Sequence, residues 1–248
     1  MALITPKQVV SIAFTNKNTD HYLVKPAFVE IAELNFIQPL IGRVLYENIS
    51  ESVINSETWT WDNVNCETVI GSDSVTITTP NSQPIKVNDF LSSSSLSLYE
   101  KSDGADSANR GLNKIISCVT NASGEVTRLK ISGVATETNT SAKITFRRPN
   151  EVLNTDYIIN YLAFCVKFEM MPDMSYNTTS QGVVENVAEF TMPVDSKKLN
   201  FLRNETFKKS DTYSRRMTRF LINNSKAYPD YIDELAGGVS KLNGIILY

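Results

Sequence analysis

The sequence predicts an α+β protein, in which a helical core of about four helices is interrupted by an inserted all-β module of the sandwich or barrel type. The first observation behind this is periodicity, because the apolar pattern is helical at both ends of the chain and has period two in the middle. The second is composition, because Ser and Thr make up 28 of the 99 residues 52–150 and 19 of the other 149. We therefore expect a discontinuous helical domain (1–51 and 151–248) and an inserted β domain (52–150).

The first helical part contains clear start signals. Thr5 followed by Pro6 and Gln8 is the pattern of an N-cap, a proline at the first helical position and a capping box. A second helix is expected from Pro26, and Pro39 predicts either a kink in it or the start of a new helix. Its apolar residues recur at spacings of three and four and predict one buried stripe, made of Ala27, Ile31, Leu34, Ile37 and Ile41.

The middle of the chain alternates as half-buried strands do. Residues 74–78 and 142–146 have period two, and residues 115–120 and 126–131 flank a turn that contains Gly124. This last pattern predicts a β-hairpin, in which glycine can supply a positive φ. Together with further candidates near residues 84–91 and 96–101, about seven short strands are expected.

The second helical part begins with a run that is apolar nearly all round. Residues 156–171 therefore predict the central core helix, capped by Asn154 or Thr155 and ended by Pro172. A loop at 175–182, a strand at 183–190 and a long helix at about 195–226 are expected to follow. The last residues form a short apolar strand and are candidates for a subunit interface: Ile245, Ile246, Leu247 and Tyr248.

Composition argues against catalysis. The chain has one histidine, His21, and three cysteines, so a His-rich metal site or a four-cysteine zinc site cannot be assembled from it. A nucleophilic triad would have one possible histidine base. We expect no enzyme activity, no cofactor and no metal. Neither a secretory signal nor a run of 18 apolar residues is visible, and no membrane association is expected.

One local carboxylate pair on a helix could serve acid/base chemistry. Glu30 and Glu33 lie three residues apart on the expected second helix. Without a partner base nearby, the simpler interpretation is that both face solvent.

The sharpest local feature is a basic helix. Residues 197–226 carry nine basic and two acidic side chains, a local charge of +7, so the rest of the −3 chain carries −10. On a helical wheel Arg203 lies apart, whereas the other eight fall within an arc of roughly 120°. One sign dominates this arc, so i,i+4 ion pairing does not explain it. A solvated face and a face for an anionic partner both remain open; the eight residues are Lys197, Lys198, Lys208, Lys209, Arg215, Arg216, Arg219 and Lys226.

The β module supports an alternative function. Trp59 and Trp61 alternate, so their rings face the same side of a strand. They could stack on a sugar, which would make the module a carbohydrate-binding or adhesive domain on a helical mount. Packing in the protein core is the competing interpretation.

Three segments resemble a known family. EIAELNFIQPLIGRVLYENI (30–49), QGVVEN (181–186) and FLINNSKAYPDY (220–231) are similar to segments of the head-to-tail connector, or adaptor ring, proteins of tailed bacteriophages. The likeness is greatest to the ring proteins of crAss-like phages. It covers about residues 1–50 and 151–232, and leaves the β insert uncovered.

The resemblance implies a structural virion protein without catalytic residues. Such a protein forms a homo-oligomeric ring of about twelve copies below the portal at the head–tail junction, assembled in the host cytoplasm. The ring would line the channel through which genomic DNA passes without sequence recognition. Its expected partners are further copies of itself, the portal protein and other tail ring proteins.

Overall fold

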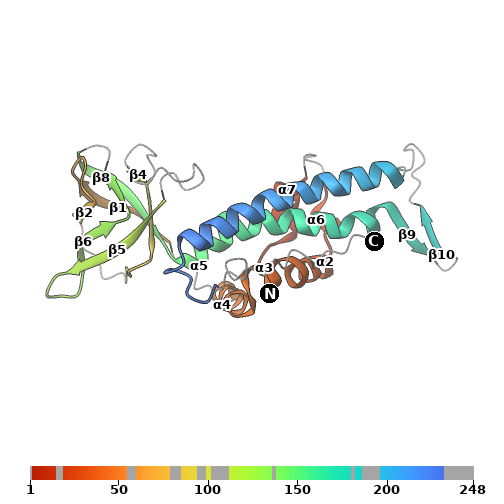
Figure 1. Ribbon diagram of the computed structural model, residues 1–248, viewed down its shortest axis with the longest axis horizontal. Coiled ribbons are helices and arrows are strands. Elements are labelled where there is room, and N and C mark those ends of the chain that lie inside the picture. Colours follow the sequence, from red (N-terminus) through yellow and green to blue (C-terminus); the bar gives the residue numbers. More distant parts are fainter. Residues whose placement is uncertain are drawn as a thin grey trace. The chain divides into compact units, whose positions relative to one another are not determined.

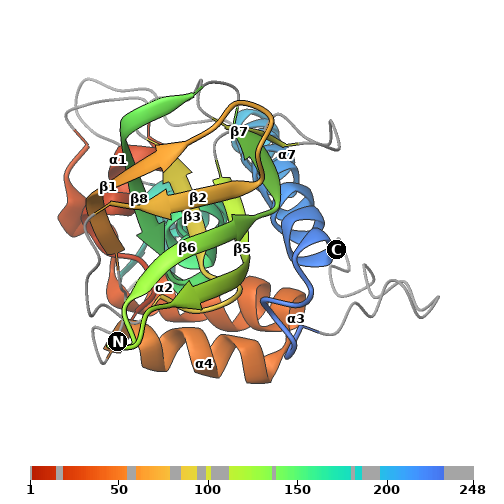
Figure 2. The same ribbon diagram turned by 90° about the vertical axis from the view of Figure 1, so that its left-hand side faces the viewer.

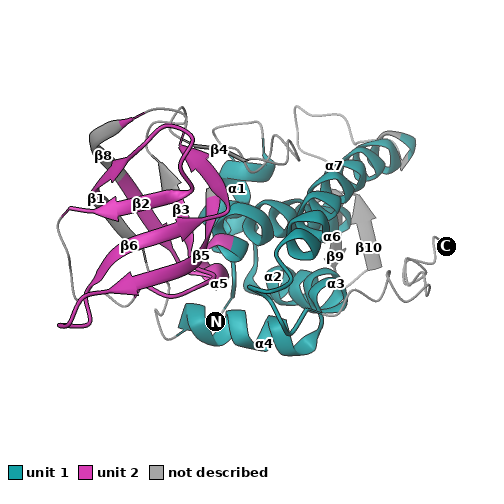
Figure 3. Ribbon diagram, turned by 60° about the vertical axis from the view of Figure 1, so that its left-hand side comes forward, with its two compact units in different colours: residues 1–54, 153–248 teal, residues 55–152 magenta. Residues whose placement is uncertain are grey.

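A computed structural model shows the arrangement of the chain (Figure 1). It describes residues 2–14, 19–54, 60–78, 85–93, 99–101, 112–135, 138–179, 182–185 and 196–231. The fold is α+β and divides into two compact units, coloured in Figure 3: residues 1–54 with 153–248, and residues 55–152. The boundaries expected from sequence were 51/52 and 150/151. Each unit is described separately below.

The N-terminal part of the helical unit begins as its sequence predicts. α1 (Pro6–Ala13) has Thr5 as its N-cap, with a complete capping box to Gln8. A short 3₁₀ turn, η1 (His21–Leu23), precedes α2 (Pro26–Ala32), which passes through a π-helical turn, η2 (Glu33–Ile37), into α3 (Gln38–Ile41). α4 (Arg43–Ile54) follows directly. Pro39 lies in the first turn of α3, in accordance with the expected start of a new helix. This helix ends sooner than expected, at Gly42, whose φ of 83° is accessible to glycine at little cost.

The predicted apolar stripe of the second helix is confirmed for Ile37 and Ile41, which are buried, and wrong for its first three residues. Ile31 and Leu34 are 43% and 47% exposed, and Ala27 is also exposed. The physical reason is a change of helical period, because the wide turn η2 shifts the phase between the residues before it and those after it, so one stripe of period 3.6 cannot include both. The buried residues of this segment are Val29, Ala32, Glu33, Ile37 and Ile41.

The central helix is buried as expected, but its ends differ. α5 (Pro149–Val152), which belongs to the second unit, is followed by the π-helical segment η4 (Leu153–Ile158) and α6 (Ile159–Ser175). A cap at Asn154 or Thr155 is therefore wrong, because both residues lie within helical turns. Pro172 lies inside α6 and does not end it. The expected total of about four helices is not confirmed.

Two strands and one long helix complete the helical unit. β9 (Tyr176–Thr179) and β10 (Gly182–Glu185) form an antiparallel two-stranded sheet where a loop was expected before a single strand. α7 (Ser196–Asn223) then runs back antiparallel to α6, as Figure 1 shows. α6 lies in contact with α1, α2 and α7, and is the core of the unit.

The second unit is a closed antiparallel barrel with the strand order β1-β2-β6-β5-β3-β8 (Figure 2). A separate pair, β4 (Tyr99–Lys101) and β7 (Gly133–Ala135), belongs to the same unit. The barrel strands are β1 (Thr60–Thr68), β2 (Ser74–Ile77), β3 (Phe90–Ser93), β5 (Leu112–Thr120), β6 (Val126–Ile131) and β8 (Asn139–Arg147).

Closure settles the choice between sandwich and barrel. β1 pairs with both β2 and β8, and irregularities in its register with β8 let the long strand bend around the barrel. The predicted hairpin is confirmed: β5 and β6 pair across a turn in which Gly124 has a φ of 80°. Inward-facing side chains fill the barrel, among them Cys66, Leu91, Ile115 and Phe146.

Candidate functional site

The inner face of α7 is held against α6 by aromatic contacts. Phe164 stacks on Tyr213 with ring centroids 5.4 Å apart, and the rings of Phe168 and Phe207 are 5.7 Å apart. From the first contact to the second, the residue number rises on α6 and falls on α7, as an antiparallel pair of helices requires. These contacts fix the rotation of α7 about its axis, and therefore determine which side chains face outward.

The C-terminal end of α7 has an aromatic cluster of its own. Phe220 stacks on Tyr157 at 4.2 Å and meets the ring of Tyr228 edge-on at 5.7 Å. All three rings are buried. The Arg216 guanidinium lies 5.5 Å from the Tyr157 ring, so this cluster also supports one member of the basic set.

Arg203, which lies apart from the other basic residues on the wheel, is accounted for by packing. Its guanidinium lies 4.2 Å from the centroid of the Phe168 ring, and the residue is half-buried. When the planar guanidinium of an arginine lies on an aromatic ring, the aliphatic part of the side chain can be buried while the group stays charged. Arg203 therefore belongs to the contact between α6 and α7.

The opposite face of α7 and the turn after it present the basic side chains to solvent. We call this set the basic face, and seven of its eight members are exposed: Lys197, Lys208, Lys209, Arg215, Arg216, Arg219 and Lys226. The side chain of Lys198 lies outside the described residues. Met217, Phe220 and Tyr228 are buried on the other side.

Local ion pairs neutralise part of the basic face. Lys208 lies 2.8 Å from Glu205, and Arg215 lies 2.6 Å from Asp211. Both basic partners are more than 70% exposed, and such pairs contribute little to stability. Residues 197–226 carry nine basic and two acidic side chains, so the segment that forms the basic face has an excess of positive charge.

Two exposed apolar residues accompany the basic face near the start of α7, and a third, Ile222, lies near its end. Phe201 is 64% and Leu202 is 48% exposed, and both lie in the N-terminal half of α7. α7 is continuous from Ser196 to Asn223, so both residues belong to the same helix as the basic side chains. The surface of α7 is thus basic with an apolar element, which suits a partner that is not purely ionic.

Several predicted residues cannot be placed. Residues 245–248 and Trp59 lie outside the described residues, and of Trp61 only the backbone is described, in β1 opposite Phe146. The interface at the end of the sequence and the sugar-stacking pair therefore stay predictions.

Glu33 is not solvent-facing, and that prediction is wrong. Its side chain is buried in η2, whereas Glu30 is exposed. One carboxylate oxygen accepts a hydrogen bond from the Leu3 backbone N–H at 2.6 Å, and the other accepts one from the Tyr46 hydroxyl at 3.0 Å. Burial raises the pKa of Glu33, and the two hydrogen bonds offset this only in part. The arrangement ties the N-terminal segment and α4 to the second helix.

Replacing Glu33 by Gln should change how stability depends on pH. Because the pKa of Glu33 is raised on folding, its protonated form stabilises the fold below the ordinary value of 4.5, and this stabilisation is lost as pH rises through the folded pKa. Glu33→Gln does not titrate, so its stability relative to wild type should increase as pH rises above about 4.5. Urea unfolding from about pH 4 to about pH 8 measures the difference.

The matched control is Glu30→Gln, which removes the same charge from an exposed position three residues away and reports the general effect of that charge. A Glu33→Gln difference that stayed constant with pH, or that moved in favour of wild type as pH rose, would contradict the assignment.

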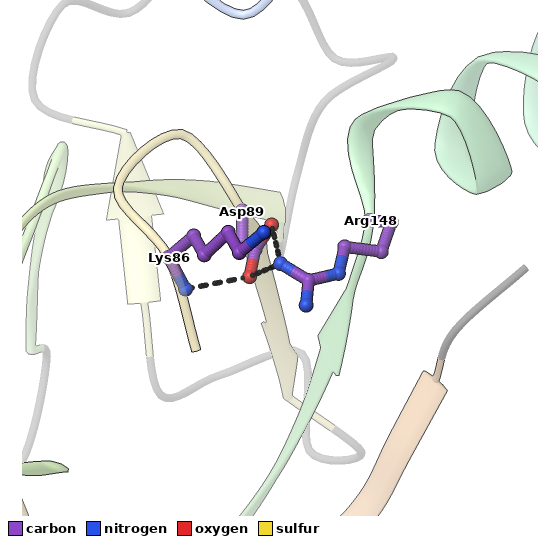
Figure 4. Close-up of polar contacts among 3 residues, drawn as sticks. All are labelled: Lys86, Asp89 and Arg148. Atoms are coloured by element: carbon purple, nitrogen blue, oxygen red, sulfur yellow. Dashed lines mark hydrogen bonds and ion pairs between the residues drawn. The ribbon is translucent and has the colours of Figure 1, made fainter. Parts of the chain in front are cut away.

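A second buried polar cluster lies in the barrel unit (Figure 4). Asp89 has a side chain only 3% exposed, and accepts hydrogen bonds from Arg148 at 2.8 and 3.1 Å and from the Lys86 backbone N–H at 2.8 Å. Burial raises the pKa of Asp89, while Lys86 and Arg148 act in the opposite direction. The pair Asp89 and Arg148 could not be predicted from sequence, because the two residues lie 59 positions apart and share no motif. The cluster joins the start of β3 to the end of β8, which is a structural role.

Among the described residues no group of three or more His, Cys, Asp or Glu side chains is placed to hold a metal ion. Within the same residues, no helix has both the length and the apolar character needed to cross a bilayer.

Comparison with known proteins finds one similarity. Residues 127–239, from β6 to beyond α7, match the model of a family of unknown function, DUF6712. No curated protein and no solved structure matches the chain.

Proposed function

We propose that the protein is a structural subunit of a ring at the head–tail junction of a tailed bacteriophage, where it connects portal and tail. The observation that carries the proposal is the basic face of α7, which is exposed along a helix whose other side is fixed in the core. The resemblance of residues 30–49, 181–186 and 220–231 to connector proteins supplies the virion context. The first of these segments forms the succession from α2 to α4.

In this role the paired helices α6 and α7 form part of the ring wall. Repeating α7 around a ring would produce a belt of positive charge along the DNA channel. Lys and Arg contacts to phosphates are independent of base sequence and weaken with salt, as suits DNA that must pass through. The same face could instead dock on an acidic portal or tail protein. In the same proposal the helical unit is the adaptor core, and the barrel contacts a neighbouring ring. No residue is assigned a catalytic, cofactor or metal role.

Removing charge from the basic face should weaken DNA binding more than removing it elsewhere. The triple variant Lys208→Gln, Lys209→Gln and Arg219→Gln should bind a labelled duplex more weakly than wild type. The slope of log K against log salt should fall by about 0.9 for each phosphate that the variant no longer neutralises. Fluorescence anisotropy with two unrelated duplexes measures both quantities, and the two sequences should behave alike.

The control removes three exposed charges outside α7, with Lys7→Gln, Lys25→Gln and Arg128→Gln. It changes the net charge by the same amount. Equal reductions in affinity for both variants would mean that DNA senses only net charge. In that case we would assign the basic face to the binding of an acidic protein partner.

The location in the virion needs a separate experiment. Mass spectrometry of purified virions should detect the chain, and antibody labelling should place it at the neck. Mass photometry of the protein, alone and with the portal protein, should show a closed oligomer. A protein that stays monomeric and does not bind the portal protein would contradict the proposal.

A further inference from the structure

The helical unit has an exposed apolar row along α2 and the start of η2. Ala27 and Ile31 lie four residues apart on one face of α2, and Leu34 follows at the start of η2. All three side chains are exposed, and so are Tyr22 and Leu23 just before the helix. Single exposed apolar residues are ordinary, whereas a row of them is typical of a surface that binds another protein.

The charge around this apolar row is negative. α4 lies against the second helix, because the Tyr46 hydroxyl donates a hydrogen bond to Glu33. Residues 19–54 expose two basic side chains, Lys25 and Arg43, and Arg43 is paired with Glu47. The same residues expose four acidic side chains: Asp20, Glu30, Glu47 and Glu51. We call these four residues, together with the apolar row Ala27, Ile31 and Leu34, the acidic surface.

One edge of α7 has the complementary composition. At about 100° per residue, Lys197, Arg215 and Ile222 fall within about 20° of one another on the helical wheel, and Phe201 lies within about 60° of all three. All four side chains are exposed, and we call them the Phe201 edge. A DNA backbone offers phosphates to the two cations but no apolar partner to the other two residues. The acidic surface offers both.

The acidic surface and the Phe201 edge lie on different sides of the helical unit. α2 and α7 each pack on the core helix α6, and Figure 1 shows α7 on its upper side and α2 on its lower side. The inner sides of both helices are buried, with Val29 and Ala32 on α2 and Met217 and Phe220 on α7, so neither helix can turn its outer side toward the other. A contact between the two surfaces therefore joins two copies. It is head-to-tail, which is the geometry that closes a ring.

We propose that the Phe201 edge of one copy docks on the acidic surface of a second copy. This inference rests on the proposed ring function and names the surfaces that join its subunits. Phe201 and Ile222 lie against the apolar row of α2 and exclude water, while the two basic side chains of the edge face carboxylates and fix the orientation of the contact. Basic side chains beyond the edge, such as Lys209, remain available to DNA.

Charge reversal in the full chain tests the contact. The edge variant carries Lys197→Glu and Arg215→Glu, and the surface variant carries Glu30→Lys and Glu51→Lys. Either variant alone places like charges across the contact. Each should need at least about tenfold more protein than wild type for half-assembly. Mass photometry measures this concentration under the conditions, with or without the portal protein, in which wild type forms its oligomer.

Mixing the two variants is the decisive measurement. In the mixture, the unchanged acidic surface of the edge variant meets the unchanged edge of the surface variant, and the two reversed sites meet each other. Opposite charges therefore face each other at every contact, and most of the lost assembly should return. A chain that carries all four substitutions should recover in the same way. An anionic partner other than a second copy, such as DNA or an acidic tail protein, does not produce this recovery, so its absence would overturn the inference.

A control variant and an uncharged variant complete the test. Lys7→Glu with Arg128→Glu changes the net charge as the edge variant does, at exposed positions outside both surfaces, and should assemble like wild type. Ile31→Gln with Leu34→Gln removes apolar contacts without changing charge, and should weaken assembly while the melting temperature of the monomer stays unchanged. An equal loss of assembly in the control, or a loss of monomer stability in the uncharged variant without a loss of assembly, would overturn the inference.

The outcomes separate the inference from the ring proposal. Closed oligomers that form equally well with the edge variant and the surface variant would overturn the inference and leave the ring standing. Recovery on mixing that yields pairs or open chains, with or without the portal protein, would support the contact and contradict the ring.

Discussion

Replacing Arg148 by Ala should lower the free energy of unfolding of the barrel unit by about 3 kcal/mol. The substitution leaves the Asp89 carboxylate buried with one backbone donor, the Lys86 N–H, and without its compensating charge. Removing one partner of a buried pair is costly because the remaining charge stays desolvated. Arg148 is itself 20% exposed, so the loss should lie at the lower end of the range for buried pairs.

Urea unfolding of the full chain measures the loss, with hydrogen exchange of the β3 and β8 amides to assign it to the barrel unit. Asp89→Asn should cost less, because an amide oxygen can still accept from Lys86. The matched control is Arg43→Ala, which breaks an exposed pair with Glu47 and should leave stability unchanged within error. Equal effects at Arg148 and Arg43 would contradict a structural role for the buried pair.

Replacing Phe220 by Ala should cost the helical unit about 3–5 kcal/mol. The ring is 2% exposed and contacts Tyr157 and Tyr228, so its removal leaves a cavity and separates two aromatic residues. The effect should also reach the basic face, because Arg216 lies over Tyr157. Thermal unfolding and urea unfolding measure the change in stability.

Phe201→Ala is the matched control, because it is the same substitution on the same helix at a residue that is 64% exposed. It should change stability by less than about 0.5 kcal/mol. If Phe201 has a partner, its substitution should weaken assembly or binding instead. A large stability loss at Phe201, or a small one at Phe220, would contradict the orientation of α7.

Local sequence signals predicted the parts of the fold that depend on near neighbours. The cap at Thr5, the turn at Gly124 and the buried run of α6 each follow from residues a few positions apart. The basic face could be predicted for the same reason, since one continuous helix places all of its residues except Lys226 by angle alone. Arg203 was correctly separated from them, although its contact with Phe168 was not foreseen.

Signals that depend on distant contacts or on a change of helical period were missed. Ile31 and Leu34 are exposed and Glu33 is buried, because the wide π-helical turn η2 breaks the constant angle per residue on which the expected stripe depends. Barrel closure and the Asp89–Arg148 pair join residues far apart in the chain, and no local pattern encodes such partners.

The sequence by itself determined the alternation of helical and β segments, the concentration of positive charge in one helix, and the scarcity of histidine and cysteine. These properties follow from composition and period, which do not depend on how the chain closes. Only the tertiary structure decided which face of each helix is buried, and that the β module is a closed barrel. Those properties depend on which distant residues meet, because burial and strand pairing are set by the partner and not by the segment alone.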